Sequence, residues 1–130
     1  MRMSPASLKS LLQTNIAEIK FIRRRPASGQ SDSRRMLCTN CRMFLNTFSA
    51  REVFHFTPPT QPPRYDDVSK GLVRAYDLIM QGYRSINATS ADVVTIIPVY
   101  TVKMIDEFWV YFNKNILPLK TQQKTDFMNN

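Results

Sequence analysis

Two cysteines, Cys38 and Cys41, are separated by Thr39 and Asn40, a spacing at which two thiolates can ligate one metal ion. Structural zinc takes four ligands in a tetrahedron. The chain offers these two cysteines and one histidine, His55, so a zinc site within one chain lacks a fourth ligand of these types. A redox pair would open a helix in a βαβ unit, which the surrounding pattern does not indicate. We therefore predict that Cys38 is a core cysteine, with a shared zinc ion as the alternative and no other cofactor.

Catalytic residue types are few and scattered along the chain. His55 stands between Phe54 and Phe56, which indicates a half-buried strand residue rather than a general base. Asp66 and Asp67 are adjacent carboxylates in a proline-flanked loop, where we expect them to be solvated. With only three glycines, the chain has no glycine-rich loop to hold a phosphate. The sequence therefore predicts a protein that is not an enzyme.

The basic residues are the feature most able to bind a ligand. The formal net charge is +8. Residues 1–42 carry nine Lys and Arg against two acids, a net +7, whereas residues 43–130 carry nine against eight, a net +1. A positive field concentrated in this way attracts polyanions. We predict salt-sensitive contacts, of low sequence specificity, to nucleic-acid phosphates by Arg23, Arg24, Arg25, Arg34 and Arg35. The alternative is a solvated charged edge that prevents sheets from pairing with one another.

Length and composition predict one folded domain. A chain of 130 residues with 43% hydrophobic and 22% charged residues can bury a core. It has no run of about 18–20 apolar residues that could span a bilayer, so we expect no membrane partner. We also expect no secretory signal, and two clustered cysteines give no disulfide framework, which favours an intracellular setting.

A helix is expected at each end of the chain. Ser4 suits the cap and Pro5 the first turn of an N-terminal helix, assigned to residues 1–16. Thr101 caps a C-terminal amphipathic helix, assigned to residues 99–119, and Pro118 ends it. Its apolar stripe provides an interface formed by Phe108, Trp109 and Phe112. We expect the polar tail, residues 120–130, to be flexible.

Residues 17–98 are expected to form a β domain. Alternation of apolar and polar residues, with turn residues between them, predicts strands from Ala17 into Arg23–Arg25 and at 34–38, 53–56, 72–80, 83–87 and 92–97. The proline-rich residues 57–63 are expected to form a stiff surface crossing, with a polyproline ligand as the alternative.

The strand pair at 72–87 carries the clearest β pattern. A two-residue turn at Gln81-Gly82 would place Ile79 opposite Arg84 and Asp77 opposite Ile86. Asp77 and Arg84 would then be diagonal neighbours on one face of the sheet. We predict that they form a structural ion pair.

Three segments carry a family resemblance: Arg35-Met36-Leu37-Cys38-Thr39, Arg64-Tyr65, and Val73 to Ile86, which includes Gln81-Gly82-Tyr83-Arg84-Ser85. They resemble the short WYL-like proteins of phages and large DNA viruses. The similarity runs from about Ala17 to Pro98. It implies a small five-stranded Sm-like or SH3-like β-barrel and a viral or phage source, and it implies no known activity. The insertion at 57–63 and the two terminal helices depart from a minimal barrel and suit docking onto other subunits.

Together these features predict an α+β fold that is mostly β, a five-stranded barrel with N-terminal and C-terminal helices. The first functional hypothesis is a non-enzymatic viral module that associates with nucleic acid. The second is a virion structural or assembly protein, such as a minor capsid or cementing component, which can also form a homo-oligomer. The third is a modulator of a host protein. The expected location is the virion, or the cytoplasm or nucleus of an infected host cell.

Overall fold

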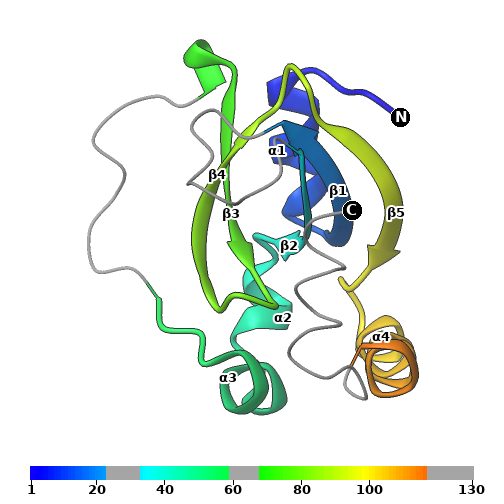
Figure 1. Cartoon of the computed structure of the whole chain (residues 1–130). Coiled ribbons are helices and arrows are strands. Elements are labelled where there is room, and N and C mark those ends of the chain that lie inside the picture. Colours follow the sequence, from blue (N-terminus) through cyan, green and yellow to red (C-terminus); the bar gives the residue numbers. More distant parts are fainter. Residues whose placement is uncertain (23–32, 59–67, 117–130) are drawn as a thin grey trace.

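The computed structural model describes residues 1–22, 33–58 and 68–116, which form a five-stranded antiparallel sheet with helices (Figure 1). The strand order is β4-β3-β2-β1-β5, so β4 and β5 are the two edges. In chain order the elements are α1 (Pro5–Leu12), β1 (Asn15–Ile22), β2 (Ser33–Thr39), α2 (Arg42–Leu45), α3 (Phe48–Phe54), the 3-10 helix η1 (Val68–Lys70), β3 (Leu72–Asp77), β4 (Gly82–Asn87), β5 (Asp92–Pro98) and α4 (Val102–Asn115).

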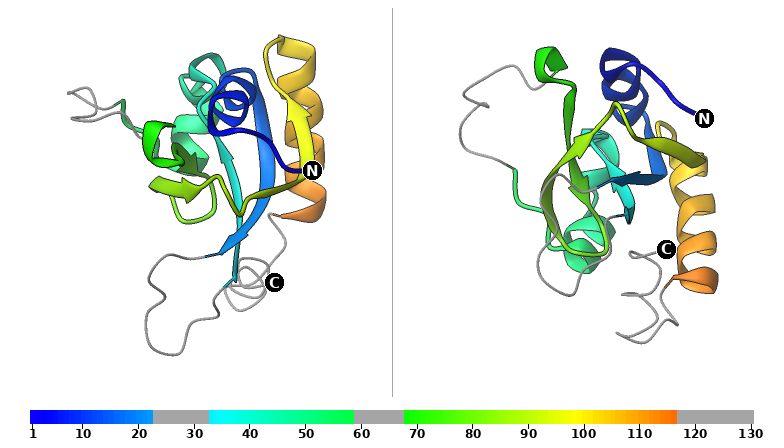
Figure 2. Two further views of the ribbon diagram at one scale, coloured as in Figure 1. Left: turned by 90° about the horizontal axis from the view of Figure 1, so that it is seen from above. Right: turned by 45° about the horizontal axis from the view of Figure 1, so that its top comes forward.

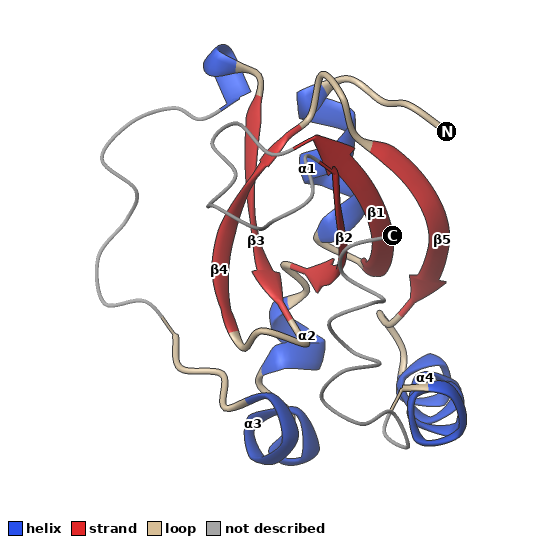
Figure 3. Cartoon of the chain, in the orientation of Figure 1, coloured by secondary structure: helices blue, strands red, loops and turns tan. Residues whose placement is uncertain are grey.

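The expected fold class, strands with flanking helices, is confirmed (Figure 3). Within the described residues no strand pairing joins β4 to β5, so the sheet is open. The closed Sm-like or SH3-like barrel therefore stays a prediction.

Both faces of the sheet contribute to a core, with successive residues of a strand pointing to opposite faces. In β1, Ile16 belongs to a core that contains residues of α2, α3 and α4. Its neighbours Ala17 and Ile19 belong to a second core, which contains Leu8 and Leu12 of α1. We call these the aromatic core and the α1 core. Figure 2 shows α1 (blue), α2 and α3 (cyan to green) and α4 (yellow to orange) around the strands.

The N-terminal helix forms as its cap residues predict. The Ser4 hydroxyl accepts the N–H of Ser7 at 3.1 Å, and Pro5 is the first helical residue. The helix ends at Leu12 and Asn15 already begins β1, so it is shorter than the assigned residues 1–16.

Strands β1 and β2 form the expected antiparallel hairpin. Phe21 pairs with Arg34 and Ile22 with Ser33 at the end next to the connecting loop. Arg23, Arg24 and Arg25, which follow β1, lie outside the described residues, as do residues 26–32 of the connecting loop.

The strand expected at 53–56 is wrong, because α3 continues to Phe54 and the residues after it are not in a strand. The Thr47 hydroxyl caps α3 by accepting the N–H of Ala50 at 3.2 Å. Ala50 and Phe54, four residues apart, are the buried positions, which is helical spacing. His55 ends the helix in the left-handed conformation (φ 54°) and is exposed, not half-buried in a strand. Residues 59–63 of the proline-rich segment lie outside the described residues.

The register expected for the β3–β4 hairpin is also wrong. The strand ends at Asp77 rather than Met80, and Asp77 pairs with Gly82 while Val73 pairs with Ile86. The physical reason is the Asp77 carboxylate, whose Oδ1 accepts the N–H groups of Ile79 and Met80 at 3.0 Å each. An aspartate that binds the backbone two and three residues ahead starts a turn.

The C-terminal helix α4 begins after Thr101, whose hydroxyl accepts the N–H of Met104 at 3.2 Å. Val99 and Tyr100 precede the helix, and residues 117–119 of the expected span lie outside the described residues, as does the tail at 120–130. The three residues expected to form a helix interface lie in or against the aromatic core, where each ring contacts Phe44 or Phe54: Phe108, Trp109 and Phe112.

In the described ranges, no helix has both the length and the apolar character needed to cross a membrane.

Phe44 lies at the centre of the aromatic core, so its truncation measures how much this core contributes to stability. It is fully buried, and its ring contacts Phe54, Phe108 and Trp109. Phe44→Ala leaves a cavity beneath α4, so we expect a loss of about 3–5 kcal/mol in the free energy of unfolding. Urea unfolding followed by the fluorescence of the single tryptophan, Trp109, measures it.

The matched control is Phe48→Ala. Phe48 is the same residue type but is 78% exposed, so its truncation should change the free energy of unfolding by less than about 0.5 kcal/mol. Equal losses in the two variants would contradict the assignment of Phe44 to the core.

Candidate functional site

Two of the five arginines predicted to contact phosphates are held by acids of the same chain. The Arg34 guanidinium forms an ion pair with Oδ2 of Asp77. The Arg34 side chain is 15% exposed and that of Asp77 is fully buried. Arg35 forms an ion pair with Glu18, whose other oxygen accepts the Thr95 hydroxyl at 2.8 Å. These two arginines therefore connect strands of the sheet.

The Asp77 carboxylate has Arg34 as its ion-pair partner, where we expected Arg84. Arg84 lies opposite Ala75 in β3, so it is still a diagonal neighbour of Asp77, as predicted. Its Nη1 donates instead to the Tyr83 carbonyl at 2.8 Å. The Arg84 guanidinium lies over Gly82, where an added Cβ would be 2.9 Å from Nη1.

Burial raises the pKa of the Asp77 carboxyl above its ordinary value. The N–H groups of the turn and the Arg34 guanidinium oppose that increase, and Arg84 contributes a smaller opposing effect. Burial of the charged form therefore outweighs the favourable contacts.

The two cysteines lie in different cores. Cys38 points into the α1 core, and Cys41 belongs to the aromatic core, where its Sγ donates to the Val99 carbonyl at 3.7 Å. Burial raises the pKa of the Cys38 thiol far above its usual range, and the Asp77 charge adds to the increase. Because the two thiols belong to different cores, the two side chains do not converge on one ion. In the part of the chain that the structure describes, no group of three or more His, Cys, Asp or Glu side chains could hold a metal ion.

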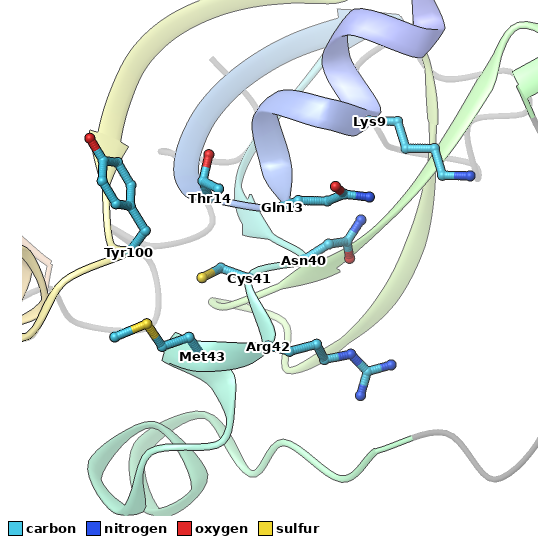
Figure 4. A pocket seen from close by; sticks show the side chains of 8 residues that line it. All are labelled: Lys9, Gln13, Thr14, Asn40, Cys41, Arg42, Met43 and Tyr100. Carbon is cyan, nitrogen blue, oxygen red and sulfur yellow. The ribbon is translucent and has the colours of Figure 1, made fainter.

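A different set of residues forms an open groove of about 560 Å³ where the end of α1 meets α2 (Figure 4). The residues come from α1 and the turn after it, from the link between β2 and α2, from the start of α2, and from the segment before α4. They are Lys9, Gln13, Thr14, Asn40, Cys41, Arg42, Met43 and Tyr100.

Backbone hydrogen bonds fix the relative positions of these segments. The Asn40 N–H donates to the Leu12 carbonyl at 2.9 Å, and the Val99 N–H donates to the Thr14 carbonyl at 3.1 Å. The groove is therefore built on backbone that is anchored to both α1 and β5, although many of its side chains are exposed.

The groove has a polar part and an apolar part. Figure 4 shows the amides of Gln13 and Asn40 between the amino group of Lys9 and the guanidinium of Arg42. Tyr100 and Met43, which are 50% and 48% exposed, lie on the other side. The lining contains two cations and no carboxylate.

Aromatic rings orient the arginines near the groove. The Arg42 guanidinium lies over the ring of Phe56, 5.4 Å from its centroid, and that of Arg74 lies over Tyr83, 5.7 Å from its centroid. The Asn40 amide donates to the Arg74 carbonyl at 2.6 Å, which connects Arg74 to the groove. A cation over a ring keeps its charge and its outward hydrogen-bond donors.

None of the acids among the described residues lines the groove. They are six, against twelve Lys and Arg. Glu18, Asp77 and Asp92 are paired with Arg35, Arg34 and the amino group of Met1. The remaining three are Glu52 of α3 and Asp106 and Glu107 of α4. The sequence could not reveal this groove, because its residues come from separate segments and only Lys9 and Arg42 carry a charge.

Replacement of Arg34 by Met should raise the pKa of Asp77 further above its ordinary value of 3.8, because the cation that opposes the effect of burial is lost. A carboxyl whose pKa is higher in the folded state destabilises the fold as pH rises through that pKa. We therefore expect Arg34→Met to lose stability up to a higher pH than the parent does, and about 3–5 kcal/mol at neutral pH. Carbon NMR titration of the carboxyl and urea unfolding at several pH values measure both effects.

Arg84→Met is the matched control. Its effect on the pKa of Asp77 should be smaller, because Arg84 opposes the increase less than Arg34 does. A larger shift in Arg84→Met than in Arg34→Met would instead favour the ion pair predicted from the sequence.

Comparison with protein-family models, with curated protein sequences and with solved structures finds no match to this chain. The resemblance to the WYL-like proteins is therefore untested by these comparisons and stays a prediction.

Proposed function

We propose that the chain is a non-enzymatic basic module that associates with nucleic acid through phosphate contacts. The observation that carries the proposal is the groove surface, where the exposed Lys9 and Arg42 lie without a lining carboxylate. Half of the described acids are paired with cations, and the others are on α3 and α4. A polyanion would therefore meet a surface with uncompensated positive charge.

The proposal assigns the arginines two different roles. Arg34 and Arg35 stabilise the sheet through Asp77 and Glu18. Arg23, Arg24 and Arg25 remain proposed phosphate contacts beyond the end of β1, together with Lys9 and Arg42 of the groove. Such contacts fix a protein on the nucleic-acid backbone and carry little sequence information.

We further propose that the sheet belongs to an Sm-like or SH3-like barrel of a viral or phage protein. The strand order supports this, since β1 pairs with β2 on one side and with the last strand, β5, on the other.

Salt dependence tests the phosphate contacts. Each phosphate contact to duplex DNA contributes about 0.9 to the slope of log K against log salt concentration. The triple variant Arg23→Ala, Arg24→Ala, Arg25→Ala should therefore lower the slope by up to about 3 and weaken binding. Fluorescence anisotropy of a labelled duplex, titrated at several salt concentrations, measures both quantities.

Lys114→Ala is the control, because Lys114 is an exposed cation in the last turn of α4 that does not line the groove and is not among the proposed phosphate contacts. It should leave the slope unchanged. Undetectable binding of the parent chain to DNA and RNA at about 50 mM salt, where phosphate contacts are strong, would overturn the proposed function.

A second candidate is a structural or assembly protein. It is favoured by apolar side chains that are exposed on β5 and α4, namely Val94 (48%), Val102 (69%) and Val110 (69%). Exposed apolar surface favours association with other chains. If this role holds, sedimentation equilibrium without nucleic acid should show self-association that increases with concentration; a monomer at all concentrations would remove the homo-oligomer.

A further inference from the structure

We propose that the groove binds a single strand of nucleic acid, with a phosphate at the polar part and a base against Tyr100. This inference rests on the proposed function and deepens it, since it names the form of nucleic acid that the groove would accept. It assigns roles to Lys9 and Arg42 in binding the phosphate, and to Tyr100 and Met43 in contacting the base.

The side chains of the groove are available for a ligand. Lys9, Gln13 and Tyr100 have no side-chain partner among the described residues. Asn40 uses its amide nitrogen for the Arg74 carbonyl, so its oxygen can accept a hydrogen bond from a base. Arg42 lies over Phe56, and its guanidinium donors can reach an anion.

The arrangement matches the chemistry of a nucleotide. A phosphate needs cationic donors, and Lys9 and Arg42 provide them on both sides of two amides. A base needs a flat apolar surface, and the half-exposed ring of Tyr100 provides one. A cavity of about 560 Å³ is in the range of small-molecule sites.

The exposed ring of Tyr100 is the reason to expect a single strand rather than a duplex. Base pairs within a duplex are stacked on one another, so their faces are not open to a side chain. An unpaired base can stack on an exposed ring, and such contacts combined with a basic groove are typical of proteins that bind single strands. The backbone bonds at Asn40 and Val99 fix the segments on which these side chains stand, which lowers the entropic cost of binding.

Anisotropy titrations of labelled oligothymidine and of a labelled duplex of equal length test the inference. Tyr100→Ala should weaken binding of the single strand about tenfold, in the middle of the range for loss of one stacked base, and should leave duplex binding unchanged. Tyr100→Phe keeps the ring and should restore single-strand binding. Phe48→Ala removes an exposed aromatic side chain outside the groove and should change neither.

A second readout locates the base directly. Ultraviolet crosslinking of a strand that contains 5-iodouracil, followed by mass spectrometry, should modify Tyr100 in the parent chain. Unchanged single-strand affinity in Tyr100→Ala, with a crosslink elsewhere, would overturn the groove assignment while salt-dependent duplex binding still supports the proposed function. Absence of binding to either nucleic acid would overturn both.

Discussion

The Asp77 carboxylate is the group on which the middle of the sheet depends. One oxygen accepts two N–H groups of the turn that leads to β4, and the other binds Arg34 of β2. It therefore ends β3, sets the register of β4 and holds the start of β2 through Arg34. Because it is fully buried, each of these contacts compensates a desolvated charge, and loss of one leaves that charge without a partner. The second pair, Glu18 and Arg35, connects β1 to β2 on the opposite face.

These two ion pairs determine which of the many basic residues are available to a ligand. Asp77 and Glu18 each form an ion pair with one arginine, so these acids do not neutralise other cations on the surface. Exposed cations such as Lys9 and Arg42 then lie without nearby carboxylates. Among the described residues, arginines lie in several environments, including an ion pair with a buried acid at Arg34, stacking on a ring at Arg42 and Arg74, and a position over Gly82 at Arg84. A guanidinium that is stacked on a ring keeps its positive charge.

Local signals predicted the two capped helices and the first hairpin, because Ser4, Thr101 and the alternation in β1 act over a few residues. The β3–β4 turn was missed because Gln81-Gly82 suggested a tight turn, whereas the carboxylate of Asp77 starts it earlier. The strand at 53–56 was expected wrongly because Phe54 and Phe56, which alternate with His55, resembled a strand, whereas Phe54 is the last residue of α3. The partner of Arg34 lies 43 residues away, and the groove combines distant segments, so neither follows from local spacing. Among the arginines, charge density alone could not separate those bound to acids from those open to a ligand.

The division of the two cysteines between the cores gives the chain a pair of internal markers. Only Thr39 and Asn40 separate the cysteines, yet the two thiols belong to different cores, and different helices contribute to each core. A thiol reagent reaches a buried sulfur only when the surrounding structure opens. The reaction of Cys38 would therefore report the opening of the α1 side, and that of Cys41 the opening of the aromatic side. The reaction rates of these two cysteines would thus measure the local opening of each core separately.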